Sequence, residues 1–429
     1  MRLPMTVVKR QPIAATRPEQ GSRAEPREFD GVICFGGGDW WYHNRGHYDM
    51  QIMRELSARV PVLFVNSIGM RVPRIAEGAM FLRRIVRKIR SLRRGMVAVN
   101  ERFHVFSPFV LPGPLGVRVS GPLLPWQVRR AARRAGIRRP LVWISCPPAA
   151  AAVDALKPVA VIYQRTDRYE AFIGVDQDRI READRFLKQR ADLTLFCSRS
   201  LFELERSACR RALFVDHGVD FDMFAAAGDA ANDVPADLAS IPKPRVGFIG
   251  GLDRHTFDAD LFDAVAGLLP DVRFVLVGAC SLPDSWRPGR NVHLLGQRAY
   301  SEVPRYMAGC DALIMPWNDN EWIRVCNPVK LKEYLAVGRP IISTPFDELA
   351  RYPGLVRIVR TPALFARAIR DALSEPADTA AMRNRVESET WTAKAEKILG
   401  EIAGLGFQPA GEMCIMQSAA SSQSAGVEV

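Results

Sequence analysis

The chain has 429 residues, of which 48% are hydrophobic and 25% charged, so its composition excludes a disordered or fibrous protein. No apolar run reaches the ~20 residues that cross a bilayer, and residues 1–23 lack the continuous apolar core of a signal peptide. The eight cysteines include no C-x-x-C pair, which argues against a zinc site and is typical of reduced cytoplasmic thiols. We therefore expect a cytoplasmic globular protein, long enough for two domains.

Positive charge is concentrated in the first third of the chain. Residues 1–150 contain 26 Lys and Arg against 9 Asp and Glu, whereas residues 151–429 contain 33 against 38. The basic surface that binds a partner should therefore lie within residues 1–150. A pI near 9.6 is compatible with nucleic-acid binding, but no helix-turn-helix, zinc-finger or RNP signature accompanies it.

Short apolar segments alternate with helical patterns between residues 29 and 407, whereas residues 1–28 and 408–429 are polar and aperiodic and should form flexible tails. The expected strands are 32–35, 62–65, 103–106, 141–144, 159–163, 193–197, 245–249, 273–277, 292–295, 312–315, 340–343 and 356–359. Near-continuous apolar strands separated by helices indicate parallel sheets covered on both faces. We predict an α/β chain of two doubly wound domains, 29–220 and 245–407, with a linker at 221–244 and a helix after the second sheet.

A glycine-rich loop, "CFGGGDWWYHNRGHYDM", follows the first of these strands and enters a helix. It is not a P-loop, because no Gly-Lys-Ser/Thr follows the glycines. Ligands of open α/β sheets bind beyond the carboxyl ends of the strands, so this loop should face a cleft between the domains. Paired tryptophans suit stacking on sugar rings. In the family that the chain resembles, as described below, side chains of this loop hold the acceptor sugar, which implies this role for Asp39, Trp40, His43, Arg45 and His47. The alternative is a structural turn whose aromatic rings cover the end of the sheet.

The segment "MFLRRIVRKIRSLRRG" predicts a basic amphipathic helix over Phe81–Arg94. Apolar residues recur at helical spacing from 81 to 92, and seven cations with no acid occupy residues 83–94. Helices of this kind lie on anionic membranes, and six further arginines follow at 129–139. The alternative is a core-packed helix with a solvated basic face.

One carboxylate stands where a general base is expected. Asp167 follows the strand in "VIYQRTDRYEAF" and could accept a proton from an acceptor hydroxyl, with His47 and Asp39 as alternates. The alternative for Asp167 is a capped turn between Arg165 and Arg168. His217, in "DHGVD", follows a strand as well, but a lone histidine is more often structural.

The stretch "NPVKLKEYLAVGRPIIST" predicts a helix over 328–337 that begins after Asn327 as N-cap and ends at Gly338. Lys330 then falls in the first turn, where the helix dipole disfavours a cation by roughly 0.3–1 kcal/mol unless an anion is bound. Glu333 lies on the same face and could accept hydrogen bonds from ribose hydroxyls. A nucleoside diphosphate would satisfy both side chains, and the alternative is a simple Lys330–Glu333 ion pair.

Four stretches follow one another in an order that resembles bacterial family 4-like glycosyltransferases of the GT-B fold, which build exopolysaccharide or teichuronic-acid-type polymers. They are "ADLTLFCSRSLFELER", "RVGFIGGLDR", "NVHLLGQRAYSEVPRYMAGCDALIMPW" and "NPVKLKEYLAVGRPIIST". The resemblance implies two Rossmann-like domains facing a central cleft, a nucleotide-sugar donor on the second domain, an acceptor on the first, and no obligatory metal or other cofactor. By matching positions it assigns donor binding to Gly250, Gly251, Arg254, Asn327, Lys330 and Glu333.

The resemblance has one gap, because many retaining members carry a second glutamate before Glu333 where this chain has Val325 and Cys326. We expect transfer of a sugar from a nucleoside-diphosphate sugar, with uridine as the expected base, to a saccharide hydroxyl. The expected acceptor is polyprenyl-linked, at the inner face of the cell membrane. Two alternatives stay open at this stage: a sugar-nucleotide epimerase of the same fold and a non-catalytic polyanion-binding protein.

Overall fold

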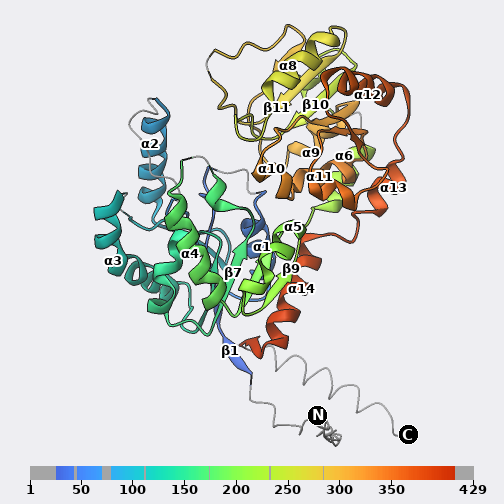
Figure 1. Cartoon of the computed structure of the whole chain (residues 1–429). Helices are drawn as coiled ribbons and strands as arrows, with labels where there is room; N and C mark the ends of the chain where they lie inside the picture. The colour runs from blue at the N-terminus through green and yellow to red at the C-terminus, as the bar shows by residue number, and fades with distance from the viewer. Residues whose placement is uncertain are drawn as a thin grey trace, which may run out of the picture.

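A computed structural model describes residues 26–42, 46–69, 79–110, 113–172, 174–230, 233–283 and 285–410. The chain forms two α/β domains, each built around its own parallel sheet (Figure 1). The first domain runs from blue to green in Figure 1, and the second lies above it in yellow and orange. The predicted pair of doubly wound domains is therefore confirmed.

The first sheet has eight strands in the order β4-β5-β3-β2-β6-β7-β8-β9. Its strands are β2 (Gly31–Phe35), β3 (Val62–Val65), β4 (Met96–Ala98), β5 (Phe103–Phe106), β6 (Pro140–Ile144), β7 (Ala160–Arg165), β8 (Leu193–Phe196) and β9 (Ala212–Phe214). All pairs are parallel except β4 with β5. Successive residues of β2 enter different cores, since Val32 packs on one face of the sheet and Ile33 on the other.

The second sheet has six parallel strands in the order β12-β11-β10-β13-β14-β15. They are β10 (Arg245–Ile249), β11 (Arg273–Val277), β12 (Val292–Leu294), β13 (Ala312–Met315), β14 (Ile341–Ser343) and β15 (Arg357–Ile358). β10 is central, with β11 and β13 as its neighbours. Loops that leave β10 and β13 therefore emerge at one edge of the sheet, where the strand order reverses.

Helices cover both sheets. They are α1 (Tyr48–Leu56), α2 (Ala79–Arg94), α3 (Gly113–Arg134), α4 (Gln177–Arg190), α5 (Arg199–Glu205), α6 (Phe221–Asp229), α7 (Ala236–Ala239), α8 (Ala259–Leu268), α9 (Val303–Ala308), α10 (Glu321–Val325), α11 (Val329–Val337), α12 (Pro362–Ser374), α13 (Thr379–Asn384) and α14 (Trp391–Gly404). No helix in the described part of the chain combines the length and the apolar character that a bilayer crossing requires.

The expected linker at 221–244 is wrong, because this segment folds as part of the second domain. It contains α6 and α7, and Phe224 and Leu238 are fully buried in that domain's core. The chain leaves the first domain just before α6, near Val219. The small residues that suggested a linker instead allow α6 to pack closely on α11: a Cβ at Gly228 would lie 2.3 Å from the carbonyl oxygen of Val337.

The last helix returns to the first domain, which corrects its assignment to the second. Trp391, Ile398 and Ile402 of α14 are buried in a core of the first domain, and Figure 1 shows α14 in red beside α1 and β9. After α14 the chain forms β16 (Phe407–Pro409), which pairs in parallel with β1 (Arg27–Phe29). Residues 27–29 and 407–409 are therefore strands, although the tails were expected to reach 28 and to begin at 408.

A buried ionic cluster joins the two places where the chain passes between domains. Lys332 of α11 is 0% exposed, and its Nζ donates to Asp216 Oδ2 at 3.0 Å, to Glu389 Oε2 at 3.0 Å and to the His217 carbonyl at 2.5 Å. Lys394 also donates to Asp216, at 2.7 Å. Asp216 precedes the first crossing and Glu389 the second, so the ammonium of Lys332 holds both crossings against α11.

We predict that Lys332→Ala lowers the free energy of unfolding by about 3 kcal/mol, because it leaves buried carboxylates short of a cation. Lys397→Ala, which removes an exposed lysine of α14, should cost less than about 1 kcal/mol. Urea denaturation near neutral pH measures both. These cations hold the pKa of Asp216 well below its usual range, so wild-type stability should fall as the pH drops below about 4. Equal urea midpoints for the two variants would contradict the assignment.

Candidate functional site

The helix α11 presents its amino end toward the first domain. It begins at Val329 with Pro328 in the N-cap position, and it ends at Gly338, whose φ of 78° is left-handed. The expected N-cap role of Asn327 is wrong: its Nδ2 instead donates to the carbonyl of Cys197 at 2.9 Å. Asn327 therefore ties the start of α11 to the end of β8 in the other domain.

Lys330 lies in the first turn of α11, as predicted, and aromatic rings surround its ammonium. Its Nζ is 4.7 Å from the centre of the Phe248 ring and 5.3 Å from that of Trp317. No ion pair of Lys330 occurs within the described ranges, so the simple Lys330–Glu333 pair is not found. Cation–π contacts of this kind contribute roughly 0.5–2 kcal/mol, which offsets the unfavourable dipole without consuming the charge.

Gly250 makes room for this ammonium at the end of β10. A Cβ at Gly250 would lie 2.1 Å from Lys330 Nζ, whereas a Cβ at Gly251 would meet nothing closer than Asp253 at 3.4 Å. The hydroxyl of Tyr334 accepts a hydrogen bond from the Ile249 N–H at 2.9 Å, which fixes α11 against the same turn. The backbone of β10 and the side chain of Lys330 are thus in direct contact.

The loop after Gly251 is folded around Asp253. The Asp253 carboxylate accepts hydrogen bonds from the N–H groups of His255 and Thr256 and from the Thr256 hydroxyl, at 2.9 to 3.0 Å. The backbone carbonyl of Arg254 accepts from Asn318 Nδ2 at 3.0 Å, while its side chain is exposed. Arg254 is therefore held by its backbone on a rigid loop beside the Gly250 turn.

Glu333 is buried one turn after Lys330. Burial raises the pKa of its carboxyl to about 7, and the charge of Lys330 partly opposes that rise. Burial also lowers the pKa of Lys330 to about 8, against the charges of Glu333 and Asp253. A nearly buried carboxylate beside an ammonium can accept hydrogen bonds from the hydroxyls of a ligand while the ammonium contacts an anionic group.

Asp167 follows β7 (Ala160–Arg165) and is half-buried. Arg165 pairs with Glu170, Asp184 and Glu205, and Arg168 pairs with Glu321, so neither arginine holds Asp167 as the capped-turn alternative required. Burial raises the pKa of the Asp167 carboxyl to about 6, with Arg165 opposing. In the described part of the chain no hydrogen bond to its side chain is formed.

Contacts between the domains bring these groups together. Phe172, which follows Asp167 in the first domain, lies 6.5 Å from the ring of His255 and 6.1 Å from that of Trp322 in the second. Burial raises the pKa of the Cys326 thiol. The charge of Asp167 raises this pKa further and that of Lys330 lowers it, so both groups lie near the thiol. Asp167 therefore faces the same interdomain region as the Gly250 turn and the start of α11.

The glycine-rich loop divides into a structural part and an accessible part. Trp40 is 2% exposed and packs on Phe64 and Phe103, which corrects its expected role as a sugar platform. Asp39 accepts from the Trp41 N–H at 3.0 Å and is half-buried. His47 is exposed, although surrounding protein lowers the pKa of its imidazole. Arg45 and His43 lie outside the described residues.

Sequence reasoning missed two residues that shape the site. Trp317 follows β13 and supports the ammonium of Lys330, while Asp253 organises the loop that presents Arg254. Asp253 carried a detectable signal, since an Asp three residues before a Thr often forms this turn. Trp317 carried none, because its contact joins segments 13 residues apart through the tertiary fold.

Among the described residues, no three His, Cys, Asp or Glu side chains are placed to hold a metal ion.

Known proteins match both the second domain and the whole fold. The family model "Glycosyl transferases group 1" matches residues 243–375. A teichuronic acid biosynthesis glycosyltransferase of Bacillus subtilis, TuaH, is 29% identical over 183 residues, which is 38% of this chain and 43% of that protein. The match thus spans less than half the length of this curated relative.

Solved structures resemble the chain over both domains. Sucrose-phosphate synthase from Thermosynechococcus elongatus has a TM-score of 0.64 at 16% identity, covering 88% of this chain and 98% of that one. HepE from Anabaena, in complex with UDP and glucose, has a TM-score of 0.58 at 14% identity, covering 87% and 99%. A UDP-forming trehalose-phosphate synthase from Burkholderia xenovorans reaches 0.60 at 10% identity, covering 88% and 100%.

These identities are all low, so the solved structures establish the fold, and the family model establishes the second domain. The expected resemblance is confirmed at both levels. The chain has the GT-B fold, and its residues 243–375 match the family model of glycosyl transferases group 1.

Proposed function

We propose that this chain transfers a sugar from a nucleoside-diphosphate sugar, with uridine as the expected base, to a hydroxyl of a saccharide acceptor. The observation that carries the proposal is the ammonium of Lys330, held over Gly250 at the amino end of α11, where it contacts two aromatic rings and forms no ion pair within the described ranges. Solved neighbours of the same fold are described with UDP or UDP-glucose, which supports this donor class.

We assign residues to each side of the proposed reaction. The bond between the anomeric carbon and the diphosphate oxygen breaks, and negative charge develops on the diphosphate. The free N–H groups of the first turn of α11, Lys330 and Arg254 would stabilise that charge. Glu333 would accept hydrogen bonds from the ribose. An acceptor hydroxyl attacks the anomeric carbon and passes its proton to Asp167, with His47 and Asp39 as alternates.

The proposed acceptor is a polyprenyl-linked saccharide at the inner face of the cell membrane, in cell-surface polysaccharide synthesis. TuaH, the curated relative, is named for teichuronic acid biosynthesis, which supports this setting. The chain would reach the bilayer through the basic helix α2. Its described side chains Val86 and Ile89 are 43% and 50% exposed, as an inserting apolar face requires. The side chains of 81–85, including Phe81, lie outside the described part.

Two of the expected membrane cations contact the first domain instead. The Nζ of Lys88 donates to the carbonyl of Ser67 at 3.1 Å, and Arg94 lies over the ring of Trp41 at 4.5 Å. These contacts anchor α2 on the first domain. Arg87, which lies over the ring of Tyr42 at 5.6 Å, is exposed as well. Arg90 and Arg93 are exposed beside Ile89 and are available to lipid headgroups.

We predict that Gly250→Ala weakens UDP binding by roughly 10- to 100-fold, because the new methyl group displaces the ammonium from the diphosphate position. Lys330→Ala should cause a similar loss. Gly267→Ala, on α8 of the same domain, is the matched control and should bind UDP like the wild type, because its Cβ would meet no atom within 4 Å. Isothermal calorimetry with UDP measures all three. Wild-type affinity in Lys330→Ala would refute the donor site.

We predict that Asp167→Asn lowers turnover by roughly 10²- to 10⁴-fold and leaves donor affinity unchanged. A base must be ionised to accept a proton, so wild-type kcat/KM should fall below about pH 6; it should also fall above about pH 8, where Lys330 loses its charge. A UDP-release assay across pH measures this profile. Asp178→Asn, an exposed carboxylate of the same domain, is the control. Near-normal turnover of Asp167→Asn would move the role to His47 or Asp39.

We predict that replacing Ile89, Arg90 and Arg93 with glutamine reduces sedimentation with phosphatidylglycerol vesicles at low salt while UDP binding is kept. Each cation near an anionic surface contributes roughly 1 kcal/mol, so two should change partitioning by more than tenfold. The control replaces Leu364 with alanine and Arg367 and Arg370 with glutamine on α12 of the second domain. Those arginines already pair with Asp371 and Asp271. Unaltered sedimentation of the α2 variant would exclude this attachment.

A further inference from the structure

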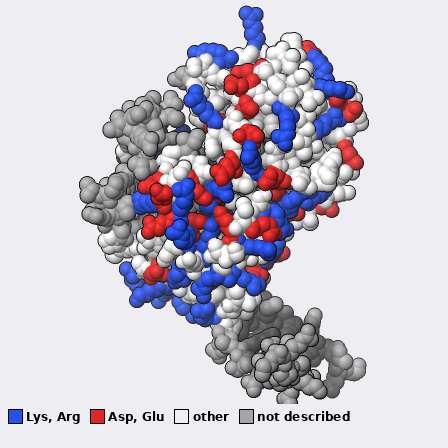
Figure 2. Space-filling model, viewed as in Figure 1, with Lys and Arg blue, Asp and Glu red and all other residues white. Residues whose placement is uncertain are grey.

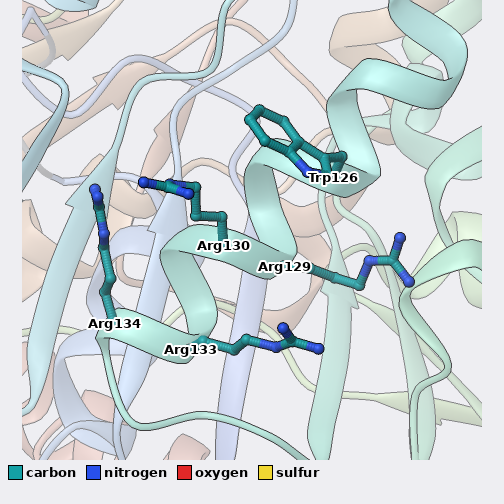
Figure 3. A pocket seen from close by; sticks show the side chains of 5 residues that line it. All are labelled: Trp126, Arg129, Arg130, Arg133 and Arg134. Atoms are coloured by element: carbon teal, nitrogen blue, oxygen red, sulfur yellow. The ribbon is translucent and has the colours of Figure 1, made fainter.

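A second basic surface lies on α3, outside the interdomain site. Figure 3 shows the side chains of one stretch of this helix, which line a cavity of about 500 Å³: Trp126, Arg129, Arg130, Arg133 and Arg134. Trp126, Arg130 and Arg134 project to one side of the helix and Arg129 and Arg133 to the other. The ring of Trp126 is 54% exposed. Figure 2 shows Lys and Arg gathered along the lower edge of the first domain.

The arginines of this surface have no carboxylate partners in the described part of the chain. None of Arg129, Arg130, Arg133 or Arg134 forms an ion pair there. From residue 79 to residue 153 the sequence holds fifteen Lys and Arg but a single acid, Glu101. Arginines spaced four apart on a helix repel one another, which destabilises the helix unless an anion lies between them. The dipole at the end of α3 favours cations in its last turn, but it does not account for Arg129, Arg130 and the exposed tryptophan.

Hydrogen bonds join this surface to α2. Gln127 of α3 both donates to the carbonyl of Phe109 and accepts from its N–H, each at 2.9 Å. Ser91 of α2 lies 2.9 Å from the hydroxyl of Ser107, two residues before Phe109. The segment that follows β5 therefore supports both helices. Phe109, which these bonds join to the residue that follows Trp126, is 47% exposed.

The combination of features selects one class of partner. A polyanion without rings or apolar groups, such as polyphosphate, would be bound by the arginines alone and would give no reason to expose Phe109 and Trp126. The interface of an anionic bilayer offers phosphate groups for arginine and an apolar boundary for aromatic rings. We propose that Trp126, Phe109 and the arginines of α3 form a second membrane-binding site, which takes the phosphate headgroups of anionic lipids. The inference rests on the proposed attachment of α2 and adds a separate contact to it.

The consequence is a defined orientation on the membrane. A single helix leaves a protein free to rotate about its contact with the membrane. A second contact, supported by the same segment, restricts that rotation. The first domain would then lie on the bilayer along α2 and α3, with the second domain directed away from α3 as in Figure 1.

The test uses the full chain and vesicles of phosphatidylcholine with or without phosphatidylglycerol. Replacing Trp126 with alanine and Arg130 and Arg134 with glutamine should lower partitioning onto the anionic vesicles on the order of 25-fold. The α12 variant described above is the matched control, because it also removes two exposed arginines and one exposed apolar residue. UDP binding should be unchanged in both, which separates this result from a failure of the proposed transferase site.

A second measurement does not depend on the stability of the variant. Phosphatidylglycerol vesicles that carry brominated chains should quench wild-type tryptophan fluorescence more than that of Trp126→Phe, which keeps an aromatic ring at this position. Equal quenching, or equal partitioning of the α3 variant and the wild type, would overturn the proposal. Loss of inorganic polyphosphate binding in the α3 variant without any change in vesicle binding would also overturn it, by assigning the arginines to a soluble polyanion. Loss of binding in the α2 variant alone would leave α2 as the membrane contact and refute the α3 site.

Discussion

The burial of one ammonium, that of Lys332, governs how the two domains meet. It sits between Asp216 and Glu389, which precede the two chain crossings, and it belongs to the helix that also carries Lys330 and Glu333. An ion in such surroundings is costly to desolvate and is stable only when every partner is in place. The position of α11 relative to the first domain is therefore sharply defined. That constraint also fixes the position of Lys330 and Glu333, the proposed donor residues, relative to Asp167 of the first domain.

Two features of the proposed donor site matter: the ammonium of Lys330 forms no ion pair within the described ranges, and Gly250 has no side chain to fill the space that the ammonium occupies. Aromatic rings hold the ammonium of Lys330, and a glycine leaves the space that it occupies. A carboxylate in their place would satisfy the charge permanently and compete with a diphosphate. Rings stabilise a cation more weakly and leave its N–H groups able to turn to a ligand. Asp167 likewise forms no ion pair within the described ranges, because its neighbouring arginines pair with other acids.

Local patterns were enough to predict the strands and the helix that bears Lys330, because apolar runs, proline and glycine act within a few residues. All twelve expected strands occur, and those missed, β1, β4, β9 and β16, are three-residue strands with little pattern of their own. Errors arose where a distant segment decided the outcome. The apolar face of α14 fits either domain, and only the fold shows that it packs on α1. Trp40 looked like an exposed platform because its partners, Phe64 and Phe103, come from other strands.

The return of α14 means that the second domain is topologically an insertion within the first. Val219 and Thr390 lie opposite each other in an isolated parallel β-bridge, and the Val219 N–H donates to the Glu389 carbonyl at 2.9 Å. The inserted segment thus begins and ends at one point, whereas the first domain is assembled from two separate stretches of chain. Recombination between relatives could exchange the whole second domain as a single segment at this junction. Exchange of the first domain alone would require two matched breaks, since α14 and β16 have to follow the rest of their domain.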